Sequence, residues 1–257
     1  MIKKSSLREA YGRELVSIGR EDKRIVVLDA DLRGSTKSCY FAKEFPERFF
    51  EMGIAEQNMI STAAGLSLVG KIPFVNTFSV FATGRPYDQI RQGVALPKLN
   101  VRIVGSSCGL SDYGDGATHQ SVEDMSIMRS IPNMVVISPV DAVETKKVVR
   151  AVVEFKGPVY IRINRNDLPV LTDENEPFKI GKVNKIAEGE DITIFATGFM
   201  VYQALQAREI LKNKGFSSRI INVSTIKPID VVKVKEYAKN VKGVITAEEH
   251  SIIGGLG

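Results

Sequence analysis

The amino-acid sequence predicts an α/β protein built as two doubly wound units with mainly parallel sheets. Short runs of consecutive apolar residues, such as 24–28 and 101–104, are typical of strands that are buried in a parallel sheet. Segments with helical spacing of apolar residues lie between these runs, and this alternation favours helices on both faces of the sheets. An acidic stretch at residues 172–177, which ends in a proline, divides the alternation into two series.

The predicted elements follow one another with little interruption. The first helix begins at a capping box in residues 6–9, after which Leu7, Tyr11, Leu15 and Ile18 repeat at helical spacing. The first unit is expected to continue with strand 24–28, loop 29–38, helix 54–69, strand 72–75, helix 86–95, strand 101–104, loop 105–118, helix 121–130, strand 134–137, helix 141–154 and strand 159–163. The second unit is expected to contain strand 192–196, helix 200–213, strand 219–223, helix 230–239 and strand 243–247.

These series give the expected domain boundaries. We expect a first unit at residues 1–171, a linker at 172–180 and a second unit at 181–257. The last predicted strand is followed by a Gly-rich turn at 253–257. Such a turn normally leads into a helix, so we expect the second unit to be truncated.

The composition excludes several classes of protein. Of the 257 residues, 44% are hydrophobic and 25% are charged, which excludes general disorder. No apolar run approaches about 18 residues, so no membrane-spanning helix is expected. The net charge of +5 is mild and both signs are mixed, which argues against a nucleic-acid partner. No signal peptide is visible and there are only two cysteines, so we expect a cytoplasmic protein.

Two titratable residues are candidates for chemistry. His119 follows a Gly-rich loop at the predicted carboxyl end of a strand, where open α/β sheets bind ligands; a role within a turn is the alternative. Glu56 lies just inside the predicted helix 54–69. It is either a carboxylate stabilised by the helix N-terminus or an acid in apolar surroundings that shares a proton with a ligand nitrogen.

Four stretches of the sequence, taken in order, resemble the C-terminal half of transketolase, in particular transketolases made as two polypeptides. They are GIAEQNM (53–59), TFSVFATGRPYDQIR (77–91), DGATHQSVEDMSIMRSIPNM (115–134) and RNDLPVL (165–171). The resemblance implies a pyrimidine-binding domain followed by part of a transketolase C-terminal domain. It also implies a transferase that moves a two-carbon ketol unit between sugar phosphates, as in the pentose phosphate pathway.

The resemblance assigns cofactor roles that the residues alone leave open. Glu56 matches the catalytic glutamate that contacts the pyrimidine N1′ of thiamine diphosphate and helps to deprotonate the thiazolium carbon. Phe78 and Phe81 match aromatic residues around the pyrimidine, where by spacing alone they are typical of core. Asp31 matches an aspartate near the thiazolium, and His119 matches the second catalytic residue.

The resemblance also predicts a substrate site. Arg8, Ser35 and Arg165 match positions that bind the sugar phosphate, and arginines are suited to bidentate phosphate contacts. Asp115 and His119 match residues that bind hydroxyls near the reacting carbons. The sequence departs from the family at one position, since Ser107 stands where a histidine that also contacts phosphate is usual.

The resemblance finally implies a partner chain. The family holds the diphosphate, with Mg²⁺ or Ca²⁺, in its N-terminal half, and we expect no metal site in this chain. Gly114-Asp115-Gly116 begins like the family's diphosphate motif, but residues 135–148 lack the asparagine that should follow. We therefore expect an N-terminal partner subunit, with self-association into a dimer or an α2β2 assembly. The alternatives are a deoxyxylulose-phosphate synthase, a 2-oxoacid dehydrogenase E1 β-subunit or a noncatalytic assembly partner.

Overall fold

The computed structural model describes residues 4–257; the first three residues of the predicted first unit lie outside the described part. The strands are β1 (Lys4–Ser6), β2 (Ile25–Asp29), β3 (Phe49–Glu51), β4 (Ile72–Phe78), β5 (Arg102–Ser106), β6 (Val135–Ile137), β7 (Val159–Ile163), β8 (Asp167–Pro169), β9 (Asn184–Ala187), β10 (Ile192–Ala196), β11 (Ser218–Asn222), β12 (Thr225–Lys227) and β13 (Gly243–Ala247). The α-helices are α1 (Leu7–Glu21), α2 (Arg33–Thr36), α3 (Cys39–Glu44), α4 (Glu56–Leu68), α5 (Ser79–Gly84), α6 (Asp124–Ser130), α7 (Ala142–Glu154), α8 (Met200–Asn213) and α9 (Val231–Tyr237). Short 3₁₀ helices η1 (Pro46–Arg48) and η3 (Gly116–Thr118) and a π-helix η2 (Gln89–Ala95) complete the set.

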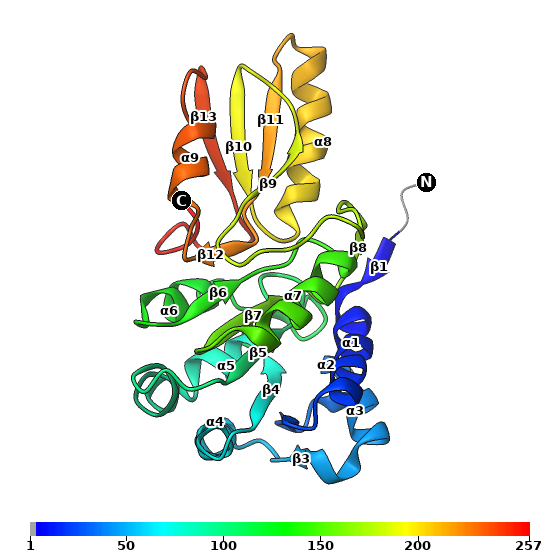
Figure 1. The fold of residues 1–257 in the computed structure, drawn as a ribbon. Helices are drawn as coiled ribbons and strands as arrows, with labels where there is room; N and C mark the ends of the chain where they lie inside the picture. The colour runs from blue at the N-terminus through cyan, green and yellow to red at the C-terminus, as the bar shows by residue number, and fades with distance from the viewer. Residues whose placement is uncertain (1–3) are drawn as a thin grey trace.

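Two sheets lie one above the other, as Figure 1 shows, each with helices packed against it. The larger sheet has seven strands in the order β12-β6-β7-β5-β4-β2-β3, and the smaller has four in the order β13-β10-β11-β9. Within each sheet the pairings are parallel except at one edge, where β12 pairs with β6 and β9 pairs with β11 in antiparallel fashion. The predicted α/β class with mainly parallel sheets is confirmed.

The predicted N-cap of α1 forms, but only as half of a capping box. The Ser6 side chain accepts a hydrogen bond from the backbone N–H of Glu9, whereas the Glu9 carboxylate accepts from Tyr40 and pairs with Lys37. Leu7, Tyr11 and Leu15 form the buried face of α1 against the larger sheet. The same device begins α7, where Asp141 accepts from the Glu144 N–H at 2.8 Å.

The two predicted units share a core. Phe195 and Ile221, from the smaller sheet, belong to the same apolar cluster as Val136 and Tyr160, from the larger one. Strand β12 follows β11 in the chain but joins the larger sheet beside β6, and its Ile226 is buried. The second series of elements is therefore docked on the first through a strand as well as through side chains.

Two predicted segments differ in detail. The helix expected at 86–95 is present mainly as the π-helix η2, residues 89–95. Helix α5, which begins at Ser79 directly after β4, was not expected. The loop expected at 29–38 contains the short helix α2. The stretch expected to be a linker, 172–180, has no helix or strand. Its start is bound to the beginning of α7, because the Asp141 side chain accepts hydrogen bonds from the Leu171 and Thr172 N–H groups at 2.7 Å.

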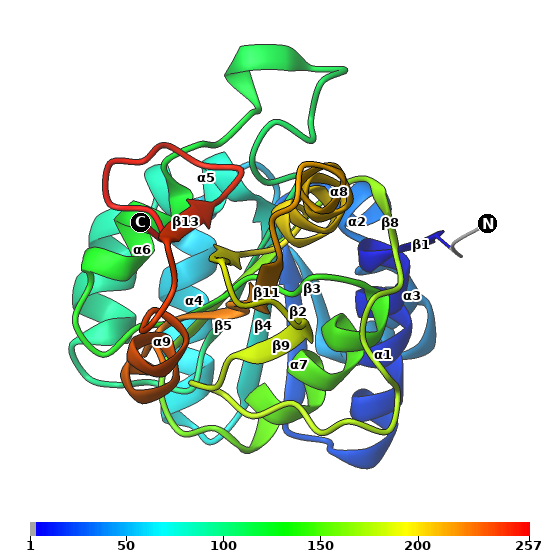
Figure 2. The same ribbon diagram turned by 90° about the horizontal axis from the view of Figure 1, so that it is seen from above.

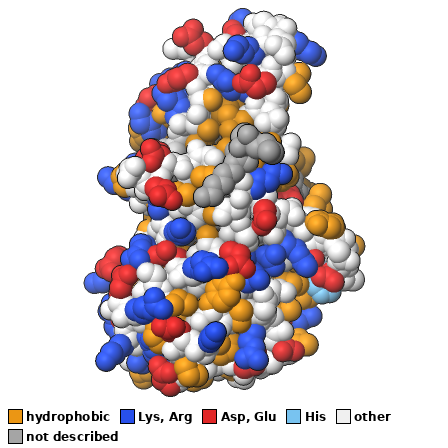
Figure 3. All heavy atoms as spheres, turned by 90° about the vertical axis from the view of Figure 1, so that its right-hand side faces the viewer, with side chains coloured by type: hydrophobic (Ala, Val, Ile, Leu, Met, Phe, Trp, Pro, Cys, Tyr) orange, Lys and Arg blue, Asp and Glu red, His pale blue; other side chains and the backbone are white. Residues whose placement is uncertain are grey.

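The surface carries charges of both signs. Figure 3 shows Lys and Arg side chains intermixed with Asp and Glu on the face it presents. Within residues 4–257, no helix has both the length and the apolar character needed to cross a membrane.

Candidate active site

The candidate site lies where parallel strands of the larger sheet end. Ser35 follows β2, Phe81 follows β4, His119 lies in the long segment after β5 and Arg165 follows β7. Because neighbouring parallel strands end at the same edge, side chains far apart in the sequence meet there, which is the usual ligand-binding edge of open α/β sheets.

A first cluster joins four of the predicted residues. The ring centroids of Phe78 and Phe81 are 6.2 Å apart, and the His119 ring packs edge-on against both, at 6.0 and 5.2 Å. Arg85 connects Glu56 to these rings: its guanidinium lies 4.0 Å from the Phe81 centroid and donates to Glu56 Oε1 at 2.6 Å. The cluster therefore combines a carboxylate, two aromatic faces and an imidazole.

Glu56 is well protected from water. It is the first residue of α4 and is only 4% exposed, at a helix end whose free N–H groups stabilise negative charge. A pocket opens beside it, lined by Ile54, Gln57, Asn58 and Arg85 among others. Arg85 was not among the predicted site residues, although it lies within the stretch 77–91 that resembles the family.

A second cluster gathers the residues predicted to bind phosphate. Arg8 Nη1 donates to the backbone oxygen of Ser35 at 2.9 Å. Burial lowers the pKa of Arg8, and the positive charge of Arg165 lowers it further, so the two guanidinium groups act on each other. Two like charges held close together at a ligand-binding edge are suited to an anion.

The same cluster contains an acid that sequence reasoning missed. Asp112 is fully buried and accepts from Arg165 Nη1 at 2.6 Å through Oδ1, while its Oδ2 has no hydrogen-bond partner. Asp115, predicted to bind a hydroxyl, lies 3.5 Å from the same guanidinium nitrogen. Nothing in the local pattern marks Asp112, because its role comes from meeting Arg165 across the sheet edge.

A buried aspartate shapes the loop after β2. Asp29 accepts from Leu32 N at 2.7 Å, from the Thr36 hydroxyl at 2.7 Å and from the Ser38 hydroxyl at 2.8 Å. Burial raises the pKa of Asp29 to about 6, although these three bonds act in the opposite direction. Asp29 thus holds the turn that presents Ser35.

Among the described residues, Asp31 and Ser107 form no side-chain hydrogen bond with either cluster. Asp31 is exposed, has a φ of 61° and donates its backbone N–H to Glu51. In the described part of the chain it forms no hydrogen bond or ion pair with another predicted site residue. Ser107 also has a positive φ, 54°, and its buried hydroxyl has no partner.

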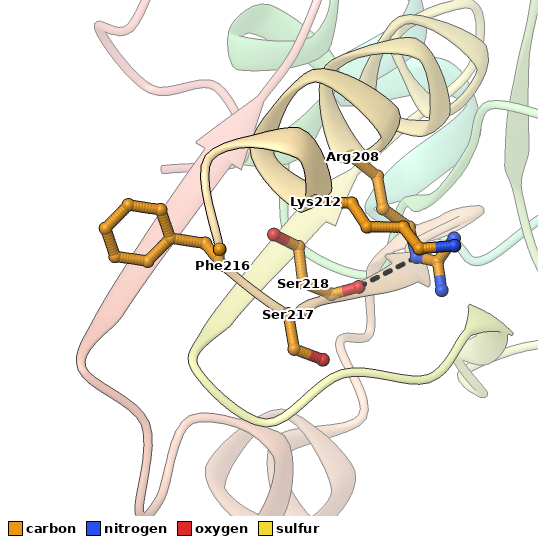
Figure 4. A pocket seen from close by; sticks show the side chains of 6 residues that line it. Arg208, Lys212, Phe216, Ser217 and Ser218 are labelled. Carbon is orange, nitrogen blue, oxygen red and sulfur yellow. Dashed lines mark hydrogen bonds between the residues drawn. The ribbon is translucent and has the colours of Figure 1, made fainter.

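Another hollow lies in the second unit, shown in Figure 4 between the end of α8 and the start of β11. None of the predicted site residues lines it. In this hollow, Arg208 donates hydrogen bonds to the backbone oxygen of Ser218 at 3.1 Å and to the Glu209 carboxylate at 2.9 Å. It is a separate surface feature.

Comparison with known proteins identifies the family of this chain. The family model of the transketolase pyrimidine-binding domain matches residues 3–170, and that of the transketolase C-terminal domain matches residues 181–257. The chain belongs to the transketolase family. Transketolases use thiamine diphosphate and a divalent metal ion.

Relatives of the chain include separately made subunits. A Methanocaldococcus jannaschii protein, provisionally named as a transketolase C-terminal section, is 53% identical over 98% of this chain and 79% of its own length. A 6-deoxy-6-sulfo-D-fructose transketolase subunit from a Clostridium species is 43% identical over 98% of this chain and 78% of its own. A solved split-gene transketolase, named an inactive β4 tetramer, has a TM-score of 0.91 and 47% identity, covering 99% of this chain and 83% of its own.

The residues present fit one end of the transketolase cofactor. A buried carboxylate beside aromatic faces suits an aminopyrimidine, which needs one hydrogen-bonding acid and apolar packing. Among residues 4–257, no group of three or more His, Cys, Asp or Glu side chains could hold a metal ion.

Proposed function

We propose that this chain is the C-terminal subunit of a two-subunit transketolase, which transfers a two-carbon ketol unit between sugar phosphates. The observation that carries the proposal is the first cluster, in which Glu56, Phe78, Phe81 and His119 meet beside a pocket at the carboxyl edge of the sheet. We propose the domain boundaries 1–171 and 181–257, joined by residues 172–180; the two family matches support them.

The first cluster would hold the pyrimidine end of the cofactor. Thiamine diphosphate, when bound, supplies the nucleophilic carbon that takes up the ketol unit. Glu56 shares a proton with the pyrimidine N1′, and its carboxyl is held in place by Arg85 and by the start of α4. Phe78 and Phe81 pack the ring and exclude water, and Asp31 lies nearer the thiazolium end.

The second cluster would hold the sugar phosphate. Arg8 and Arg165 bind the phosphate with the help of Ser35, while Asp115 and His119 position hydroxyls near the reacting carbons. Asp112 offsets part of the positive charge of Arg165. The relative named for a sulfonated sugar supports an anionic distal group in general, and we propose phosphate for this chain.

An N-terminal partner subunit would complete the site. It supplies the diphosphate contacts and the Mg²⁺ or Ca²⁺ ion, and the pair assembles further, as a dimer or α2β2, in the cytoplasm. Exposed apolar side chains near the candidate site, Ile54 at 73% and Tyr113 at 78% exposure, suit a covering partner. The solved relative named inactive supports the need for that partner.

Reconstitution tests the proposal. The chain is co-expressed with a transketolase N-terminal subunit, and transfer from a ketose phosphate to an aldose phosphate is measured with thiamine diphosphate and Mg²⁺. We expect transfer by the complex and none by either chain alone. A complex that forms and binds cofactor but instead condenses pyruvate with glyceraldehyde phosphate would contradict the proposed reaction.

A further inference from the structure

The loop that carries the substrate-binding side chains is closed at a narrow neck. Residues 109–121 form this loop. Its two ends are joined at the neck by a hydrogen bond that Ser121 N donates to the Gly109 oxygen at 3.0 Å. Beyond the neck lie Asp112, Asp115 and His119. Figure 2 shows this loop projecting from the body, with the chain end after β13 running beside its base.

A segment of the second unit binds both sides of the neck. Glu249 Oε1 accepts from the Leu110 N–H at 3.0 Å on one side, and Ser251 N donates to the Val122 oxygen at 2.8 Å on the other. Gly109 leaves room for this contact, because a Cβ there would lie 2.5 Å from Glu249 Cδ. Leu110 and Val122 are thus fastened to the same three residues, 249–251.

The same glutamate also binds the end of β7. Its Oε2 accepts from Asn164 Nδ2 at 2.8 Å, and its backbone oxygen accepts from Arg162 Nη2 at 2.7 Å. Arg162 is itself buried and paired with Asp124 at 2.8 Å, so Glu249 rests on a fixed support. Asn164 directly precedes Arg165, so one carboxylate joins the loop of Asp115 and His119 to the strand end that presents Arg165.

We propose that Glu249, from the second unit, is a positioning residue for the substrate loop. It does not touch the substrate. It fixes the position of loop 109–121 relative to Arg165, so that the substrate contacts of Asp115 and His119 form together with those of Arg165. The inference rests on the proposed function for its kinetic consequence, whereas the loop fastening is a property of this chain alone. A carboxylate with two hydrogen-bond partners on two elements can transmit such a constraint.

The test compares Glu249→Ala with Glu248→Ala in the reconstituted complex. Glu248 is the matched control, because it neighbours Glu249 but accepts from Leu256 N and Gly257 N; its contact with the segment 249–251 is a 3.9 Å approach to His250 Nδ1. Hydrogen exchange of the amides of residues 110–121 is followed together with KM for the sugar phosphates and thiazolium C2 hydrogen–deuterium exchange.

We expect Glu249→Ala to speed amide exchange in the loop at least about tenfold and to raise KM by a similar factor. C2 exchange should change much less than KM, because Glu56 is held by α4 and Arg85, outside the loop, and His119 is the one member of the first cluster that the loop carries. Glu248→Ala should leave all three at wild-type values. Unchanged loop exchange in a folded Glu249→Ala would overturn the proposal. If Glu249→Ala speeds loop exchange but the wild-type complex shows no ketol transfer, only the proposed function is contradicted.

A double-mutant cycle covers the case in which Glu249→Ala folds poorly. Gly109→Ala drives a Cβ against Glu249 and also strains the backbone, because Gly109 has a φ of 62°; both effects should speed loop exchange. In the Glu249→Ala background only the backbone strain remains, so the effect of Gly109→Ala should be smaller there. Purely additive effects of the two substitutions would contradict the fastening.

Discussion

Glu56 illustrates how one side chain is prepared by its neighbours. Arg85 donates to one of its carboxylate oxygens and stacks on Phe81, so the same guanidinium contacts both the acid and an aromatic ring. The second oxygen forms no hydrogen bond with another described residue, and Glu56 lines a pocket. Such an arrangement is suited to holding a proton at one defined atom of a bound ring.

Replacing Glu56 with Gln should almost abolish turnover of the reconstituted complex without unfolding it. Gln keeps the shape of the side chain but cannot give up and recover the proton, so thiazolium C2 hydrogen–deuterium exchange should slow by roughly 10²–10⁴-fold. Glu47→Gln, at an exposed position, serves as the control. C2 exchange at the wild-type rate in the variant would refute the role of Glu56.

Arg165 and Asp112 form a pair whose two members should act in opposite directions. Arg165→Ala should raise KM for phosphorylated sugars by roughly 10–150-fold and leave hydroxypyruvate much less affected, since a charge-assisted bond to phosphate is lost. Asp112→Asn should lower the same KM, because the guanidinium loses its buried counter-charge.

The doubly substituted protein provides the control for this pair. Arg165→Ala alone leaves Asp112 buried without its cation, so Arg165→Ala with Asp112→Asn separates loss of binding from loss of stability. Equal losses for phosphorylated and unphosphorylated substrates in all three variants would show that Arg165 is structural.

Helix α7 joins the two sheets through one buried acid. Glu144 accepts from Val140 N at 2.7 Å and, across the unit boundary, from Asn222 at 3.1 Å and the Ser224 hydroxyl at 2.5 Å. Burial raises the pKa of Glu144 to about 7, and the nearby charge of Asp141 acts in the same direction. A protonated carboxyl is thus favoured in the folded protein relative to the unfolded chain.

The stability of the protein should therefore depend on pH through Glu144. Its contribution is complete below about pH 4.5, falls as the pH rises towards 7 and is constant above, a change on the order of 3 kcal/mol. The free energy of unfolding, measured in urea from pH 5 to 8, should fall more steeply for the wild type than for Glu144→Gln. Asp29 contributes with the same sign in both proteins and cancels in the comparison. Parallel pH profiles would contradict the prediction.

The elements show which parts of the fold leave a local signature. The N-cap at Ser6 and the apolar runs of the buried strands are patterns within a few residues, and the structure has them where they were expected. The start of α5 directly after β4 and the departure of β12 to the larger sheet depend on packing against distant strands. No short stretch of sequence encodes those contacts.

The site divides in the same way. Glu56, Phe78, Phe81 and His119 come from motifs that resemble a family, and they meet in one cluster. Arg85, Asp112 and Glu249 owe their roles to partners 29, 53 and 85 positions away in the chain, so proximity alone identifies them. Asp31 remains a prediction carried by its motif.

The molecule as a whole presents the pyrimidine side of the proposed cofactor site. Its two sheets are joined by a shared core, by β12 and by Glu249, so the second unit supports the substrate loop rather than standing apart from it. The pyrimidine side has a buried acid and aromatic rings, whereas the described residues offer no metal cluster for the diphosphate side. A second chain that supplies the diphosphate contacts is the simplest completion.

Binding of thiamine diphosphate tests this division directly. Calorimetric titration with and without Mg²⁺ is carried out on the chain alone and on its complex with an N-terminal subunit. Charge-assisted bonds to the diphosphate provide much of the affinity, so the complex should bind at least about 100-fold more tightly than the chain alone, and only the complex should depend on Mg²⁺. Tight, Mg²⁺-dependent binding by the chain alone would contradict a site shared between two polypeptides.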